Sequence, residues 1–267
     1  MTTAGQRTRS DLPLRAVAGA AMIAVALGAL LLGGIAFWLL AVVAALVMMA
    51  EWAALHGAAR RERRVAQFAL AVPLAVMAPP SLILVTHDFF ALGLIGAAAF
   101  FVAAVTRRPP LALGVIYCAL PVLTLVFIRR QEEGVVFTLF TLALVWACDI
   151  GAYFAGRAIG GPKLAPRISP NKTWAGLAGG VAAAGAFGLL MHWHYGLPWR
   201  LTLASPALAV LAQGGDLYES WLKRRAGVKD SGAILPGHGG VMDRLDGLVP
   251  VAPVAAFLIV LPYFYPR

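Results

Sequence analysis

Two polar segments interrupt an otherwise apolar chain and hold most of the residues that could do chemistry. The first segment, residues 156–173, reads GRAIGGPKLAPRISPNKT. It supplies hydroxyl donors at Ser169 and Thr173 and a cation at Lys172, and Thr173 is expected to cap a following helix. Lysines beside a helix N-terminus form a phosphate site. An ordinary basic loop that obeys the positive-inside rule is the competing interpretation.

The second segment, residues 217–247, reads LYESWLKRRAGVKDSGAILPGHGGVMDRLDG. Its glycines allow the backbone to approach a ligand closely. The interleaving of cations and carboxylates is unlike a simple solvated loop and indicates binding of phosphate or metal. We expect His238, which stands between glycines, to contact a phosphate or a base rather than a metal. The other candidate groups are Lys223, Arg224, Lys229, Asp243, Arg244 and Asp246.

Two further carboxylates, Asp149 and Asp216, fall near the ends of apolar runs. Acidic groups at membrane depth are costly, and they are functional by default. Two other interpretations stay open: each carboxylate could lie at the membrane interface, or could pair with a nearby Arg or Lys. Glu51 ends another apolar run beside the cluster 60–64, and we interpret it as a solvated boundary residue.

Helical spacing would bring several of these oxygens together, because residues three or four apart share a helix face. Such sets can hold one hard cation, and Mg²⁺ prefers oxygen ligands and often shares them with substrate phosphates. The sets are Asp149–Tyr153–Gly156, Asp216–Glu219–Ser220 and Asp243–Asp246.

The elements that must position these residues are predicted to be membrane-spanning helices. Apolar residues make up 61% of the 267 residues and charged residues only 13%. The apolar runs are continuous and close to the roughly 20 residues that a spanning helix needs. We therefore predict an all-α polytopic membrane protein with nine spans, at about 15–32, 35–50, 65–86, 89–106, 111–128, 134–155, 174–194, 201–217 and 248–264.

The basic residues predict the orientation of these spans. With the N-terminus in the cytoplasm and the C-terminus outside, all but four of the 22 Lys and Arg fall on the cytoplasmic side, as the positive-inside rule requires. The exceptions are Arg129, Arg130, Arg200 and Arg267. Both polar segments would then face the cytoplasm. The net charge of +10 is explained by this topology and by attraction to anionic lipids, so nucleic-acid binding is not expected.

The second segment resembles the signature of phosphatidate cytidylyltransferases (CDP-diacylglycerol synthases). The matching positions are Ser220, Lys223-Arg224, Lys229-Asp230, Gly232, Leu235-Pro236, His238-Gly239-Gly240, Asp243-Arg244 and Asp246. Upstream, Asp149–Tyr153–Gly156, the stretch 169–174 and Gly215-Asp216 are also similar to this family. The resemblance covers most of the chain and is weakest over the first hundred or so residues. It departs at Ala175, where the family has Glu, and at Gly247, where it has a small hydroxyl residue.

The resemblance implies that the chain transfers a cytidylyl group from CTP to phosphatidate and releases pyrophosphate. It implies a divalent cation such as Mg²⁺ and leaves open a second cation. The implied catalytic residues are Asp216, Asp243, Asp246 and Lys229. The metal ligands would be Asp216, Asp243 and Asp246, with Asp149 and Ser220 as additional candidates. The implied substrate-binding residues are Ser169, Lys172, Thr173, Ser220, Lys223, Arg224, His238 and Arg244.

Two other functions compete with this one. A secondary transporter also uses broken helices and membrane-depth acids, but its polar residues gather near the midplane. A different CTP-dependent lipid enzyme, such as a polyprenol kinase, would share the basic loops. We expect a single integral domain, with spans at about 15–128 and a catalytic part at about 134–264, in a bacterial inner membrane. Spacings of the GxxxG type are compatible with a homodimer.

Overall fold

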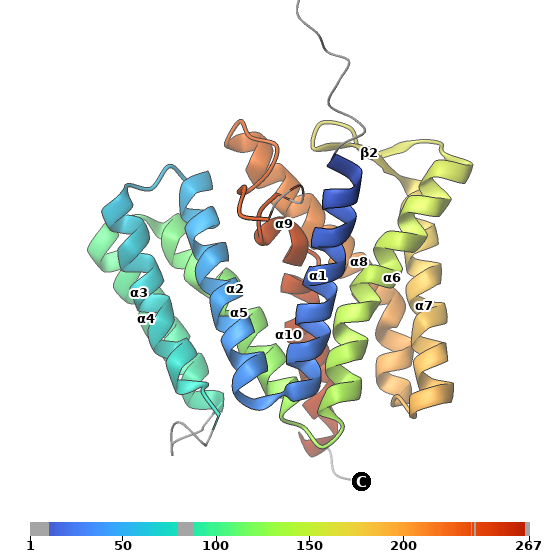
Figure 1. The fold of residues 1–267 in the computed structure, drawn as a ribbon, viewed down its shortest axis with the longest axis horizontal. Coiled ribbons are helices and arrows are strands. Elements are labelled where there is room, and N and C mark those ends of the chain that lie inside the picture. Colours follow the sequence, from blue (N-terminus) through green and yellow to red (C-terminus); the bar gives the residue numbers. More distant parts are fainter. Residues whose placement is uncertain (1–10, 80–87, 236, 238, 265–267) are drawn as a thin grey trace, which may run out of the picture.

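The computed structural model is an almost entirely helical bundle, and it describes residues 11–79, 88–235, 237 and 239–264. Successive long helices run up and down the bundle (Figure 1). The helices are α1 (Asp11–Leu32), α2 (Gly34–Leu55), α3 (Arg60–Val76), α4 (Asp88–Thr106), α5 (Pro109–Arg129), α6 (Gly134–Ile159), α7 (Trp174–Tyr195), α8 (Trp199–Arg225), α9 (Met242–Leu245) and α10 (Leu248–Phe264).

The helical class is confirmed, and each expected span coincides with a helix. Within the described residues, four helices are long and apolar enough to cross a membrane, namely α2, α5, α6 and α7. Shorter apolar stretches lie at Val17–Leu32, Phe90–Thr106 and Leu248–Pro262. The chain is therefore built as an all-α membrane protein, while the count of nine spans and their orientation stay predictions.

Two helix ends differ from the expected spans. The expected span at 65–86 ends early, because α3 stops at Val76, shortly before Pro79, and a proline disfavours helical geometry in the residue before it. Helix α8 instead continues beyond residue 217 to Arg225. Its last turn carries three cations, which interact favourably with the helix dipole at a C-terminus. The first third of the second polar segment is thus helical.

The expected loop at 156–173 is only partly a loop. Helix α6 continues to Ile159, and β1 (Lys163–Ala165) pairs antiparallel with β2 (Ser169–Thr173). The hairpin lies at the same end of the bundle as α9 and the beginning of α1 (Figure 1). The sequence of the hairpin has no alternation of apolar and polar residues, which is the usual signal of a strand. These strands are held by backbone pairing and do not bury one face, so the signal is absent.

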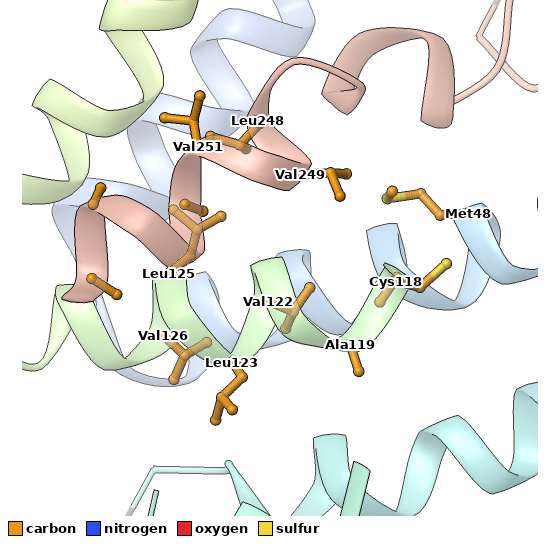
Figure 2. Close-up of a cluster of buried hydrophobic side chains, with 14 of the residues drawn as sticks. Met48, Cys118, Ala119, Val122, Leu123, Leu125, Val126, Leu248, Val249 and Val251 are labelled. Atoms are coloured by element: carbon orange, nitrogen blue, oxygen red, sulfur yellow. The ribbon is translucent and has the colours of Figure 1, made fainter. Parts of the chain in front are cut away.

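A buried apolar cluster holds the centre of the bundle together. Figure 2 shows Met48 of α2, Cys118 and Val122 of α5, and Leu248 and Val251 of α10 converging in this cluster. All five side chains are buried. Helix α10 leads directly out of the second polar segment, so this packing anchors the end of that segment to α2 and α5.

Small residues bring α6 and α7 into close contact. A Cβ on Gly151 would meet the methyl group of Ala183 and, at 2.7 Å, the carbonyl oxygen of Gly179. Farther along, Gly156 would meet the Cα of Gly176 at 3.5 Å. Such close approach is the usual way in which membrane helices associate, since lipid offers no hydrophobic drive between them.

This contact predicts that Gly151→Ala destabilises the protein. The added methyl would press on backbone atoms that cannot move aside, and overpacking of this kind costs about 1–3 kcal/mol. The midpoint of thermal unfolding in detergent should fall by several degrees. Gly96→Ala in α4 is the control, because nothing lies within 4 Å of its added Cβ. Equal midpoints for the two variants would contradict the packing.

Candidate active site

An ion pair joins the first polar segment to Asp216, the residue directly before the second segment. Lys172 Nζ of β2 lies 2.5 Å from Asp216 Oδ2 of α8, and both side chains are mostly shielded from solvent. Ser220, one turn along α8, donates a hydrogen bond to the other Asp216 oxygen at 3.3 Å. The shared helix face expected for Asp216 and Ser220 is therefore present. The expectation that a membrane-depth acid pairs with a nearby Lys also holds for Asp216.

Gln213 extends this pair to Asp149 of α6. Its side-chain nitrogen donates to Asp149 Oδ1 at 3.2 Å, and its oxygen accepts from Lys172 Nζ at 2.9 Å. The result is a continuous network that runs from Asp149 through Gln213 and Lys172 to Asp216. Sequence reasoning missed Gln213, although a buried amide three residues before Asp216 was an available signal.

Asp246 lies close to this network, directly after α9. A Cβ on Gly215 would collide with the carbonyl oxygen of Asp246, so the glycine lets that backbone approach α8. Burial, followed by the charges of Asp216 and Glu219, raises the pKa of Asp246 to about 9. The Asp246 and Glu219 carboxyl groups lie within hydrogen-bonding reach of each other. Two ionised carboxylates only accept hydrogen bonds, so this close contact needs a shared proton or a bound cation between them.

A second acidic network surrounds Asp243. Lys223 Nζ lies 2.5 Å from Asp243 Oδ1 and 2.9 Å from Glu219 Oε2. Asp243 Oδ2 accepts hydrogen bonds from the backbone N–H groups of Ser231 and Gly240, both at 2.8 Å, and from the Ser231 hydroxyl at 2.9 Å. Burial alone would raise the pKa of Asp243, but these donors together hold the pKa below its usual value.

Glu51 belongs to this second network, and its interpretation as a solvated boundary residue is wrong. Its side chain is only 4% exposed. It accepts hydrogen bonds from the backbone N–H groups of Val241 and Met242 and from the Ser231 hydroxyl. These partners lie about 190 residues away in the sequence, so local patterning gave no sign of them.

The other predicted substrate-binding residues surround these networks. Thr173 accepts a hydrogen bond from the Gly176 N–H at 3.0 Å, which confirms the expected helix cap. Ser169 begins β2. Arg224 donates to the carbonyl oxygen of Ile168, which ties α8 to the hairpin. Lys229 has an exposed side chain. Arg244 lies near enough to act electrostatically on Asp149, and His238 falls outside the described residues.

Tyr117 of α5 is a further residue that sequence reasoning missed. Its hydroxyl is buried and has no hydrogen-bond partner among the described residues. It interacts electrostatically with Glu219 and Asp246. Glu219 Oε1 likewise is buried and has no hydrogen-bond partner in the described part of the chain. A tyrosine in an apolar run carries no signal by itself, because most such residues are packing groups.

The residues near Asp246 fit a cation by their chemistry, although they do not form a finished metal site. Over the described ranges, no three Asp, Glu, His or Cys side chains converge as metal ligands. The unpartnered Glu219 oxygen, the close Asp246–Glu219 pair and the nearby Asp216 nevertheless leave negative charge in excess of its partners. Carboxylate oxygens are the ligands that Mg²⁺ prefers. Asp243 already accepts several hydrogen bonds, which favours Asp216 and Asp246 as the ligand pair.

Comparison with known proteins shows the family of this chain. The model of the cytidylyltransferase family matches residues 13–261, so the chain belongs to that family. A protein of Brucella suis named phosphatidate cytidylyltransferase is 52% identical over 144 residues, which are 53% of each chain. One of Rickettsia felis with the same name is 37% identical over 162 residues, 57% of this chain and 71% of the relative. The chain matches about half the length of the Brucella relatives.

The network predicts that Gln213→Leu destabilises the protein. The change leaves Asp149 without its amide donor and Lys172 without one acceptor, and a lost hydrogen bond to a charged group costs about 1.5–3 kcal/mol. Denaturant unfolding in detergent measures the loss. Gln131→Leu is the control, since the side chain of Gln131 donates to the Phe127 carbonyl oxygen of its own turn and meets no carboxylate within the described part of the chain. A loss no larger than that of the control would show that Gln213 is not part of a network.

Proposed function

We propose that this chain transfers the cytidylyl group of CTP to phosphatidate, giving CDP-diacylglycerol and pyrophosphate. Family membership supports nucleotidyl transfer, and the names of the Brucella and Rickettsia relatives support phosphatidate as the acceptor. The observation that carries the proposal is the 2.5 Å ion pair between Lys172 and Asp216, because it ties the first polar segment to the residue directly before the second, at one end of a bundle of apolar helices.

The reaction needs charge neutralisation and alignment more than it needs a base. The phosphate of phosphatidate is already anionic near neutral pH, and it attacks the α-phosphorus of CTP in line with the departing pyrophosphate. Preorganised cations and dipoles are the main source of rate in such transfers. The site supplies both, in a setting whose low dielectric strengthens them.

The basic residues divide into two groups by their surroundings. Lys172 and Lys223 each contact two side chains of the acidic networks, so they are fixed in position. Arg224 and Lys229 are exposed and accessible to an incoming triphosphate. We therefore assign Lys172 and Lys223 to alignment close to the reacting phosphates, and Arg224 and Lys229 to capture of the nucleotide.

Asp216 and Asp246 would hold a divalent cation, with Glu219 and Ser220 beside them. When bound, Mg²⁺ would neutralise the developing negative charge and clamp attacking and leaving oxygens. Asp149 acts through Gln213 on Lys172, which makes it a residue that orients this lysine. Asp243 accepts hydrogen bonds from the backbone of Ser231 and of Gly240 and so holds these two positions together, while its role as a ligand stays a prediction.

We further propose that the site faces the cytoplasm, where CTP is found. The basic segments of the N-terminal half gather at the same end of the bundle as the site. Arg108 donates to the carbonyl oxygen of His56 and to Glu62, and Glu51 at the end of α2 bonds to the backbone next to α9. This concentration of cations at one end supports the orientation given by the positive-inside rule. The acyl chains of phosphatidate would stay in the bilayer.

The first test is turnover of the purified chain in detergent with labelled CTP, phosphatidate and Mg²⁺. We expect CDP-diacylglycerol and pyrophosphate in equal amounts, and we expect EDTA to stop both. Transfer to a polyprenol instead of phosphatidate would identify a different lipid enzyme. The absence of any lipid product, together with uptake of a solute into proteoliposomes, would identify a transporter and refute the proposal.

The second test is Asp246→Asn, which keeps the shape of the side chain and removes its charge. We expect turnover to fall by about 10²-fold or more, as for loss of a group that stabilises charge in the transition state. Membrane insertion and the thermal midpoint should change little. Glu133→Gln, at an exposed carboxylate, is the control and should leave turnover intact. Near-normal turnover of Asp246→Asn would remove Asp246 from the site.

A further inference from the structure

Glu51 is a carboxylate that the proposed chemistry does not use and that the fold nevertheless buries. It lies on α2, and it meets a segment about 190 residues later in the sequence. Glu51 Oε1 accepts from Val241 N at 2.9 Å, and Oε2 accepts from Met242 N at 2.8 Å and from Ser231 Oγ at 3.1 Å. A buried carboxylate is tolerable only when donors meet it, and these are neutral donors.

The polypeptide closes tightly around this carboxylate. A Cβ on Gly232 or on Gly240 would come within 2.6 Å of Glu51 Oε1. A side chain at either position would displace the Glu51 carboxylate from the place where its donors meet it, so glycine is what lets the segment approach this closely. Glu51 is thus enclosed by two glycines and three donors of one segment, which is more than a chance contact at a helix end.

The enclosed segment carries the acids of the site. Val241 and Met242 immediately precede Asp243, and Asp246 follows within the next turn. The short helix α9 has few internal hydrogen bonds, and its first N–H groups need partners from outside. Glu51 supplies them from α2. The Ser231 hydroxyl lies within hydrogen-bonding distance of both Glu51 and Asp243 and can donate its single proton to either, so the two carboxylates share this residue.

We propose that Glu51 is a positioning residue, which fixes Ser231 and the backbone of Val241 and Met242 so that Asp246 faces Asp216 and Glu219. It touches neither substrate nor cation and acts only through Asp243 and Asp246. The inference rests on the proposed function for its meaning in catalysis. The positioning role can also be tested without turnover, through the affinity of the protein for a cation. Loss of a group that orients metal ligands typically lowers metal affinity or activity by about 10–100-fold.

The test compares Glu51→Gln with Glu62→Gln in the full chain in detergent. Gln keeps the size of Glu51 but turns one acceptor into a donor, which would oppose a backbone N–H group. Glu62 is a carboxylate at the start of α3, and it pairs with Arg108 away from the site. Hydrogen exchange of the backbone at 240–242 and stabilisation of the protein by Mg²⁺ alone are measured for both variants and for the unaltered chain.

We expect Glu51→Gln to speed exchange at 240–242 and to raise the Mg²⁺ concentration for half-maximal stabilisation by about 10-fold or more. Turnover should fall in parallel, with Glu51→Asp recovering part of it, while Glu62→Gln behaves as the unaltered chain. Ser231→Ala, a milder change at the same turn, should show the same trends and serves if Glu51→Gln does not fold.

Faster exchange with an unchanged Mg²⁺ response would overturn the proposal, because Glu51 would then be structural only. Unchanged exchange would overturn it as well, because the contact itself would be absent. If the unaltered chain responds to Mg²⁺ but makes no CDP-diacylglycerol, the proposed reaction fails, while the shifted Mg²⁺ response of Glu51→Gln still supports the positioning role.

Discussion

The cost of burying carboxylates beside apolar helices constrains the whole polar end of this molecule. An isolated charge in such surroundings is strongly disfavoured unless donors or opposite charges meet it. The acids Glu51, Asp149, Asp216, Asp243 and Asp246 come from four different helices and the turn after α9, which meet there. Each of the first four meets donors supplied by another segment, so the burial of the acids dictates how the hairpin, α8 and the segment around α9 must come together.

The acids separate into two networks with different consequences. Around Asp243, donors are plentiful, and its carboxylate is held in place by four hydrogen bonds. Around Asp246 and Glu219, donors are fewer. Asp246 accepts from the Gly247 N–H and Glu219 Oε2 accepts from Lys223, while the other Glu219 oxygen is buried and has no partner among the described residues. A fully satisfied network rigidifies a structure, whereas a buried polar atom without a partner is costly. The fold thus places a rigid acidic network next to a close pair of carboxyl groups whose negative charges oppose each other.

Close packing of α6 against α7 allows the polar groups of the site to reach one another. The glycines of α6 and α7 allow these helices to touch along their length, which carries the hairpin beside α8. Lys172 and Asp149 can then reach the same amide, that of Gln213, from two different elements. A wider spacing between α6 and α7 would break this three-part contact, since hydrogen bonds weaken steeply beyond about 3.2 Å.

The sequence alone determined the helical membrane class, the position of almost every helix, the cap at Thr173 and membership of the cytidylyltransferase family, because these depend on composition, local spacing or a family signature. The tertiary structure decided the features that depend on contacts between segments far apart in the sequence. It turned part of a loop into a hairpin, recruited Gln213 and Tyr117, and buried Glu51 against a turn about 190 residues away. Local patterns carry the period of a helix and the residue types of a motif, but the partner of a buried charge is set only when distant segments meet.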